Sequence, residues 1–132
     1  MSIREKWDQV DIPAFVAAWL SERRNGGNGS NDSLSMKMTL MSFSASPEVQ
    51  WTFIKQAIEQ SSSDDELGEI AAGPFEALFG KYGIDYIDKL EEQCQVKPKF
   101  GRMTTGAWQH TMTDDIWTRV QAIQKKATPL DG

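Results

Sequence analysis

The fold of this chain is decided by the stretch Ala71-Ala72-Gly73-Pro74-Phe75-Glu76-Ala77-Leu78-Phe79-Gly80-Lys81-Tyr82-Gly83-Ile84-Asp85-Tyr86-Ile87-Asp88-Lys89-Leu90. Its apolar residues recur three and four positions apart, which is the spacing of one face of a helix. We expect Gly73 to end one helix, Pro74 to begin the next and Gly83 to cap it. A further amphipathic helix then starts at Ile84, which we expect on its inner face.

Helical patterns flank this stretch on both sides. Asp11 and Pro13 predict the start of a helix that ends near Arg24, and Ser46 and Pro47 predict the start of another. The remaining helices are expected over residues 33–43, 63–70, 98–106 and 113–126, and Thr113 is expected to cap the last of them. Alternation over 33–43 also allows a strand. The sequence therefore predicts an all-α fold of six or seven short helices, arranged as an orthogonal bundle or a HEAT-like stack of helical pairs.

The length of 132 residues fits one domain over residues 1–132. A run rich in Gly, Asn and Ser at residues 25–32 is typical of a flexible loop, because glycine and short polar side chains favour neither helix nor strand. Residues 128–132 are expected to form a frayed tail. The fold should need neither a disulfide nor a metal, since a chain of this size can bury a sizeable core.

The net charge of −5 argues against broad binding to nucleic acid, which depends on clustered Lys and Arg. It is compatible with a basic protein partner, and also with the ordinary solubility of an acidic surface. No window approaches 18 continuous apolar residues, and the first residues lack the apolar segment of a signal peptide. We therefore expect no membrane contact and a cytoplasmic location.

No set of residues in the sequence predicts catalysis, a bound metal or a cofactor. His110 is the single histidine, which rules out metal motifs built on paired histidines, and it is expected to pack or to fix a loop. Cys94 is the single cysteine and is expected to be a buried, inert thiol near the end of a helix. Lys97, Lys99 and Arg102 form a small basic patch, too small for nucleic acid but able to seat one acidic group of a partner.

Several residues are candidates for contact with a partner. Tryptophan anchors many interfaces and methionine adapts to varied surfaces, although core packing is the commoner use of both. The acidic residues after Ser63 fit a helix-capping box as well as a site for a basic partner. Trp108 and Trp117 are expected in the core. The candidate partner-binding residues are Trp7, Met36, Met38, Met41, Trp51, Asp64, Asp65 and Glu66.

The chain resembles a family of small bacterial domains of unknown function over roughly residues 48–124. The resemblance rests on the following residues: Ile70-Ala71-Ala72-Gly73-Pro74-Phe75-Glu76-Ala77-Leu78, Tyr82-Gly83, Tyr86-Ile87-Asp88, Leu90-Glu91, Phe100, Gly106, Trp108 and Asp115-Ile116-Trp117-Thr118-Arg119-Val120. Where the family usually has Leu after the proline, this chain has Phe75. The resemblance implies an all-helical bacterial domain and supplies no active-site residues.

Three functional hypotheses follow. The first is a non-enzymatic protein-binding module, whose sharpest form is an immunity or antitoxin-like protein that neutralises a basic partner. The second is a structural or regulatory helical subunit that self-associates through the Met-rich helix over residues 33–43. The third, which the sequence favours least, is a small enzyme that uses His110 with a carboxylate.

Overall fold

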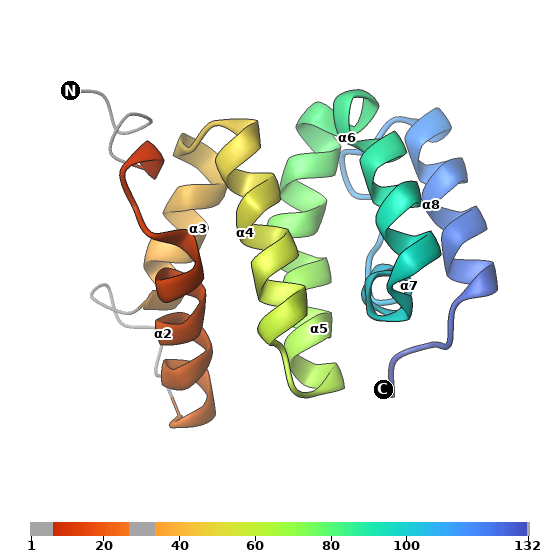
Figure 1. The fold of residues 1–132 in the computed structure, drawn as a ribbon. Helices are drawn as coiled ribbons and strands as arrows, with labels where there is room; N and C mark the ends of the chain where they lie inside the picture. Colours follow the sequence, from red (N-terminus) through yellow and green to blue (C-terminus); the bar gives the residue numbers. More distant parts are fainter. Residues whose placement is uncertain (1–6, 27–33, 132) are drawn as a thin grey trace. The chain divides into compact units, whose positions relative to one another are not determined.

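A computed structural model describes residues 7–26 and 34–131 of the chain. These residues form helices and connectors and include no strand (Figure 1), so the all-α prediction is confirmed. They group into two compact units, residues 1–61 and residues 62–132. The single-domain organisation and the choice between a bundle and a helical-pair stack stay predictions. Among the helices that the structure describes, none is long and apolar enough to cross a membrane.

The first unit contains three helices, α2 (Ile12–Arg24), α3 (Leu34–Ser44) and α4 (Pro47–Gln60). The predicted caps are present: Asp11 accepts the N–H of Ala14, and the Ser46 hydroxyl accepts the N–H of Val49. The strand alternative for residues 33–43 is excluded, because α3 is helical. Most of the predicted loop at residues 25–32 lies outside the described residues.

Aromatic rings and two polar contacts hold the first unit together. The Phe53 ring lies 5.6 Å from the rings of both Phe15 and Trp19. The Glu22 carboxylate of α2 accepts the N–H of Leu34 at 3.0 and 3.1 Å, which satisfies a free donor at the first turn of α3. The Gln60 amide donates to the Pro13 carbonyl at 3.1 Å and so ties the end of α4 to the start of α2.

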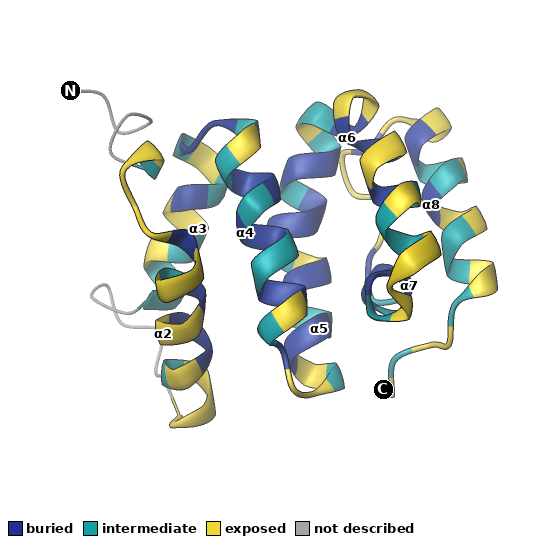
Figure 2. Ribbon diagram, in the orientation of Figure 1, coloured by how far each residue is buried: buried dark blue, intermediate teal, exposed yellow. Residues whose placement is uncertain are grey.

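The second unit contains α5 (Asp64–Ile70), a π-helical turn η1 (Ala71–Phe75), α6 (Glu76–Val96), α7 (Pro98–Thr104) and α8 (Asp114–Lys126). The later part of α6 and α8 lie side by side and run in the same direction (Figure 1). Buried residues lie along one side of α8, at Ile116 and Val120, and exposed residues along the other (Figure 2). Thr113 caps α8 as predicted.

The predicted helix break at Gly73 and Pro74 is wrong. Helix α5 continues through η1 into α6, and the N–H of Glu76 reaches back five residues to the Ala71 carbonyl. A π turn is wider than an α turn, so it accommodates a proline that lacks an N–H and crowds the preceding turn. The expected cap at Gly83 is also wrong: α6 bends at Tyr82, where φ is −127° and ψ is 22°, and then continues.

Two glycines of α6 allow close packing against the segment that follows α7. A Cβ placed on Gly83 would lie 2.9 Å from Ile116 Cγ2, and one on Gly80 would lie 2.0 Å from the Thr111 hydroxyl. The glycines are therefore contact points between elements. Ile84, which we expected on the inner face, is 81% exposed, because it lies about 100° around α6 from Gly83 and so beside the buried face formed by Gly83, Ile87 and Leu90.

The predicted fraying of residues 128–132 is wrong for the described part of that segment. The N–H of Leu130 donates to the Thr105 hydroxyl at 3.0 Å, and the N–H of Asp131 donates to the Asp64 carboxylate at 2.9 Å. The Gln124 amide donates to the Thr104 carbonyl at 2.7 Å. These contacts join the end of the chain to residues far from it in sequence, which local composition does not indicate.

Candidate protein-binding surface

Helix α3 presents large apolar side chains to solvent. Its one buried residue is Met41, whereas Leu40 is 53% exposed and Phe43 is 76% exposed. Lys37 is the single charged residue of the helix. An exposed helix face in a globular protein is normally polar, so this face departs from the usual pattern.

The positions of these residues follow from helix geometry. Met36, Leu40 and Phe43 are spaced by four and three residues, which places them on one face of α3. Met41 lies about 100° around the helix from Leu40 and points to the interior of the first unit. The apolar side chains of α3 therefore cover two faces, of which one is buried and one is open.

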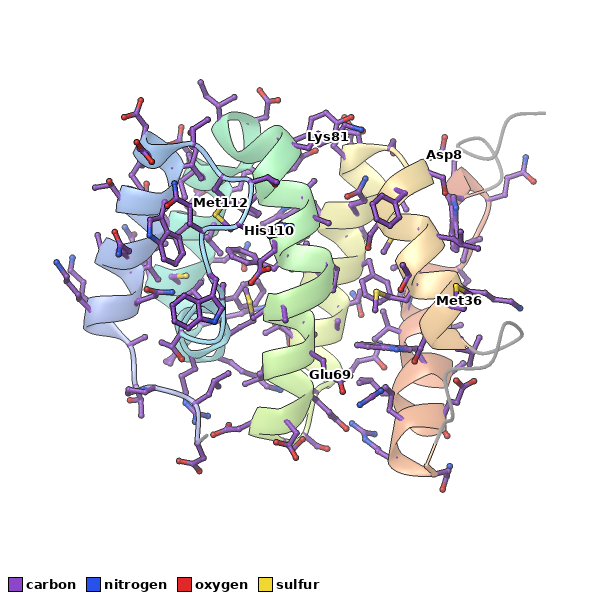
Figure 3. The ribbon with its side chains drawn as sticks, turned by 180° about the vertical axis from the view of Figure 1, so that it is seen from behind. Asp8, Met36, Glu69, Lys81, His110 and Met112 are labelled. Carbon is purple, nitrogen blue, oxygen red and sulfur yellow. The ribbon has the colours of Figure 1, made fainter. Side chains whose placement is uncertain are left out.

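Trp7 extends this face at the carboxyl end of α3. Its indole N–H donates to the Ser44 hydroxyl at 2.9 Å, and that hydroxyl donates to the Leu40 carbonyl at 2.6 Å. The Trp7 ring lies 5.6 Å from that of Phe15, which fixes its position against α2. We call Trp7, Met36, Leu40 and Phe43 the α3 surface. Figure 3 shows α3 in front, with Met36 labelled.

The structure corrects two of the predicted contact residues. Met41 is fully buried, and Trp51, which we expected to be exposed, is only 6% exposed. Both side chains pack inward from α3 and α4, so neither can touch a partner directly. Met36, Met38 and Trp7 are half-buried and remain accessible.

The predicted acidic residues lie in the second unit. Asp64 pairs with Arg102 at 2.7 Å. The N–H of Asp131 donates a hydrogen bond to the Asp64 carboxylate, and this bond is the main reason why the pKa of Asp64 lies below its ordinary value. Glu66 is buried and accepts the N–H of Ser62 at 2.8 Å, while Ser63 accepts the N–H of Glu66. The bond from the N–H of Glu66 to Ser63 is the N-cap half of the predicted capping box, whereas the Glu66 carboxylate reaches back to Ser62, the residue before the cap. Asp65 alone of the three carboxylates is exposed.

Sequence reasoning missed the exposure of Trp108, which we expected in the core. Its side chain is 76% exposed, whereas its backbone N–H donates to the buried carboxylate of Glu76 at 2.8 Å. The backbone of Trp108 is thus held firmly while its ring faces solvent. The exposure of Leu40 and Phe43 was also missed, although their shared helical face with Met36 is visible in the sequence.

The two residues considered for a reactive role, His110 and Cys94, both lie in the second unit. His110 lies on the connector before α8 near Met112 (Figure 3), is exposed, and has a left-handed backbone with φ of 48°. It does not pack as expected, and no described carboxylate bonds to it. Burial, followed by the charge of Glu91, raises the pKa of Cys94 to about 12, which suits an inert thiol. No group of metal-ligating side chains occurs among the described residues.

One family model matches the chain. It describes a family of unknown function, DUF6869, and covers residues 22–128. The match confirms the resemblance seen in the sequence and extends it toward the amino terminus, across the whole of α3. No curated protein and no solved structure matches the chain.

Proposed function

The chain belongs to DUF6869, a family of unknown function, and we propose that it is a non-enzymatic protein-binding module that docks through the α3 surface. The observation that carries this proposal is the exposure of Leu40 and Phe43 on one face of α3, at 53% and 76%. Fully burying a Leu or Phe side chain is worth roughly 1.5–3 kcal/mol. A partner that covers both residues would therefore gain a substantial part of its binding free energy there.

The composition of the α3 surface fits an anchor for a protein. Interface centres are rich in Trp, Phe and Met and poor in charge. The α3 surface contains all three residue types, and its helix carries one charged residue, Lys37. The hydrogen bond from the Trp7 indole to Ser44 holds the Trp7 ring in place before a partner arrives. Because the ring is already ordered, less conformational entropy is lost on binding.

The sharper form of this proposal is an immunity or antitoxin-like role, in which the chain neutralises a basic partner. Its support is the net charge of −5 together with the exposed carboxylates of Asp85, Asp88 and Glu92 on α6. Such charges would steer a basic protein toward the chain and would make association faster at low salt.

A second candidate function is self-association through the same surface. The absence of like charges on the α3 face favours it, since two copies of a nearly neutral apolar face do not repel each other. Light scattering at increasing protein concentration distinguishes self-association from binding to a different protein. A dimer that Phe43→Asp dissociates supports self-association, whereas a concentration-independent monomer contradicts it.

The proposal is tested by affinity capture from the source organism with matched variants. Phe43→Asp places a charge on the α3 surface, and Ile84→Asp places one at a comparably exposed apolar residue on α6. We expect the Ile84→Asp protein to retain the partner of the original chain and the Phe43→Asp protein to lose it. Equal retention by both variants would contradict docking through α3.

A further inference from the structure

A groove of about 500 Å³ lies in the second unit, between the end of α6, α7 and the later half of α8. Its volume is within the range of sites for small molecules. It is separate from the α3 surface, which belongs to the first unit. The residues that line it are Glu91, Cys94, Gln95, Pro98, Gly101, Arg102, Arg119, Ala122, Ile123, Lys126, Ala127 and Thr128.

Much of the groove wall is apolar and is held in position. Cys94, Ala122 and Ile123 contribute uncharged side chains. Gly101 allows α7 to approach the end of α8, because a Cβ placed there would lie 3.3 Å from Ala127 Cβ. The hydrogen bond from Leu130 to Thr105 holds the segment that follows Ala127. The groove is therefore formed by the fold before any ligand binds.

Three of the four charged residues that line the groove are cations, Arg102, Arg119 and Lys126, and the fourth is the carboxylate of Glu91. Arg119 is neutralised, since its guanidinium bonds to both carboxylate oxygens of Glu91 and to Asp88. Arg102 pairs with Asp64 through one terminal nitrogen, but its Nε is buried and has no hydrogen-bond partner. Among the described residues, none pairs with the exposed ammonium group of Lys126. An apolar wall with an uncompensated cation is complementary to an anion that carries an apolar body.

We propose that this groove binds a small amphipathic organic anion, with its apolar body against Cys94, Ala122 and Ile123 and its carboxylate or sulfonate at Lys126. Arg102 lines the same groove and adds a second cation to its wall. A neutral apolar ligand would leave the ammonium group of Lys126 unused, and a cation would be repelled by it. Lys126 thus favours an anion at this place in a protein whose net charge is −5.

The test is a fluorescence titration of the full chain with 8-anilinonaphthalene-1-sulfonate, an aromatic sulfonate that becomes bright in apolar sites. Lys126→Glu reverses the charge in the groove, and its control, Lys125→Glu, makes the same change on the neighbouring residue, which does not line the groove. Ala122→Trp fills the groove from an exposed helix position. Phe43→Ser removes the main apolar side chain of the α3 surface, which is another exposed apolar site for the dye.

We expect saturable binding of the dye to the original chain. Lys126→Glu should weaken the affinity for the dye by about five- to tenfold, which is the effect of reversing one partly exposed charge. Lys125→Glu should change that affinity by less than about twofold. Ala122→Trp should abolish the signal, Phe43→Ser should leave it, and decanoate should displace the dye. Equal effects of the two lysine variants, loss with Phe43→Ser, or no saturable binding would each overturn the proposal. Circular dichroism verifies that every variant is folded.

Discussion

The Asp64 carboxylate accepts two hydrogen bonds, one from the Arg102 guanidinium at 2.7 Å and one from the N–H of Asp131 at 2.9 Å. Asp64 is the first residue of α5, and Asp131 is close to the end of the chain. One side chain therefore joins the start of the second unit to its last residues. The Asp64 carboxylate therefore helps to hold the C-terminal segment, together with the hydrogen bond from Leu130 to Thr105.

The first prediction concerns the contribution of the charged Asp64 carboxylate to this docking. The pKa of Asp64 is lower in the folded chain than its ordinary value of 3.8, chiefly through the hydrogen bond from Asp131. Its stabilising contribution is thus complete above the unfolded pKa and is lost as the pH falls through the folded pKa. We expect the amide of Asp131 to exchange its hydrogen faster in Asp64→Asn than in the original chain at neutral pH, as measured by NMR.

Asp65→Asn is the control for this experiment, because Asp65 is in the same helical turn but is exposed and lies outside this contact. Its exchange rate at Asp131 should match that of the original chain. Equal acceleration in both variants would show that the loss of helix N-terminal charge, and not the contact with Asp131, releases the segment.

The second prediction separates two glycines by their surroundings. Gly83→Ala places a Cβ 2.9 Å from Ile116 Cγ2, whereas Gly68→Ala places one 4.0 Å from Leu130 Cδ1, an ordinary contact. Overpacking costs about 1–3 kcal/mol and outweighs the roughly 1 kcal/mol that Ala gains over Gly in a helix. Denaturant unfolding should show Gly83→Ala destabilised and Gly68→Ala stabilised. A stabilised Gly83→Ala would contradict the close contact between α6 and α8.

The third prediction concerns the reactivity of Cys94. Its pKa is raised by burial to about 12 from an ordinary value of 9.0, so the thiolate is scarce near pH 8. We expect an aromatic disulfide reagent to react with the folded chain about 100-fold or more slowly than with the chain in denaturant. Absorbance of the released thiolate measures both rates. Similar rates in the two states would mean that the thiol is open and ordinarily acidic.

Local signals in the sequence predicted the helices well. Asp11, Ser46, Ser63 and Thr113 were each identified as caps, and each accepts the expected backbone N–H. These contacts join residues only three positions apart, so neighbouring residues are enough to indicate them. The overall helical class follows from the same short-range information.

The errors arose where distant segments meet. Gly83 was assigned to a helix end, but its role depends on Ile116, which is 33 positions away. Trp51 is expected at the surface but is buried, and Trp108 is expected in the core but is exposed. Residue type alone does not say which face of an element is covered. For the candidate site, the apolar face of α3 was visible as a pattern, but only the structure distinguishes its open side from the side occupied by Met41.

The central claim is that the open face of α3 contacts another protein, and photo-cross-linking tests it most directly. A benzophenone amino acid is placed at position 43 in one protein and at position 84 in another, since Phe43 and Ile84 are 76% and 81% exposed. Both proteins are irradiated in an extract of the source organism. The account predicts a discrete cross-linked species, to a partner or to a second copy, from position 43 and none from position 84. Identical cross-linking from both positions, or none from position 43, would contradict it.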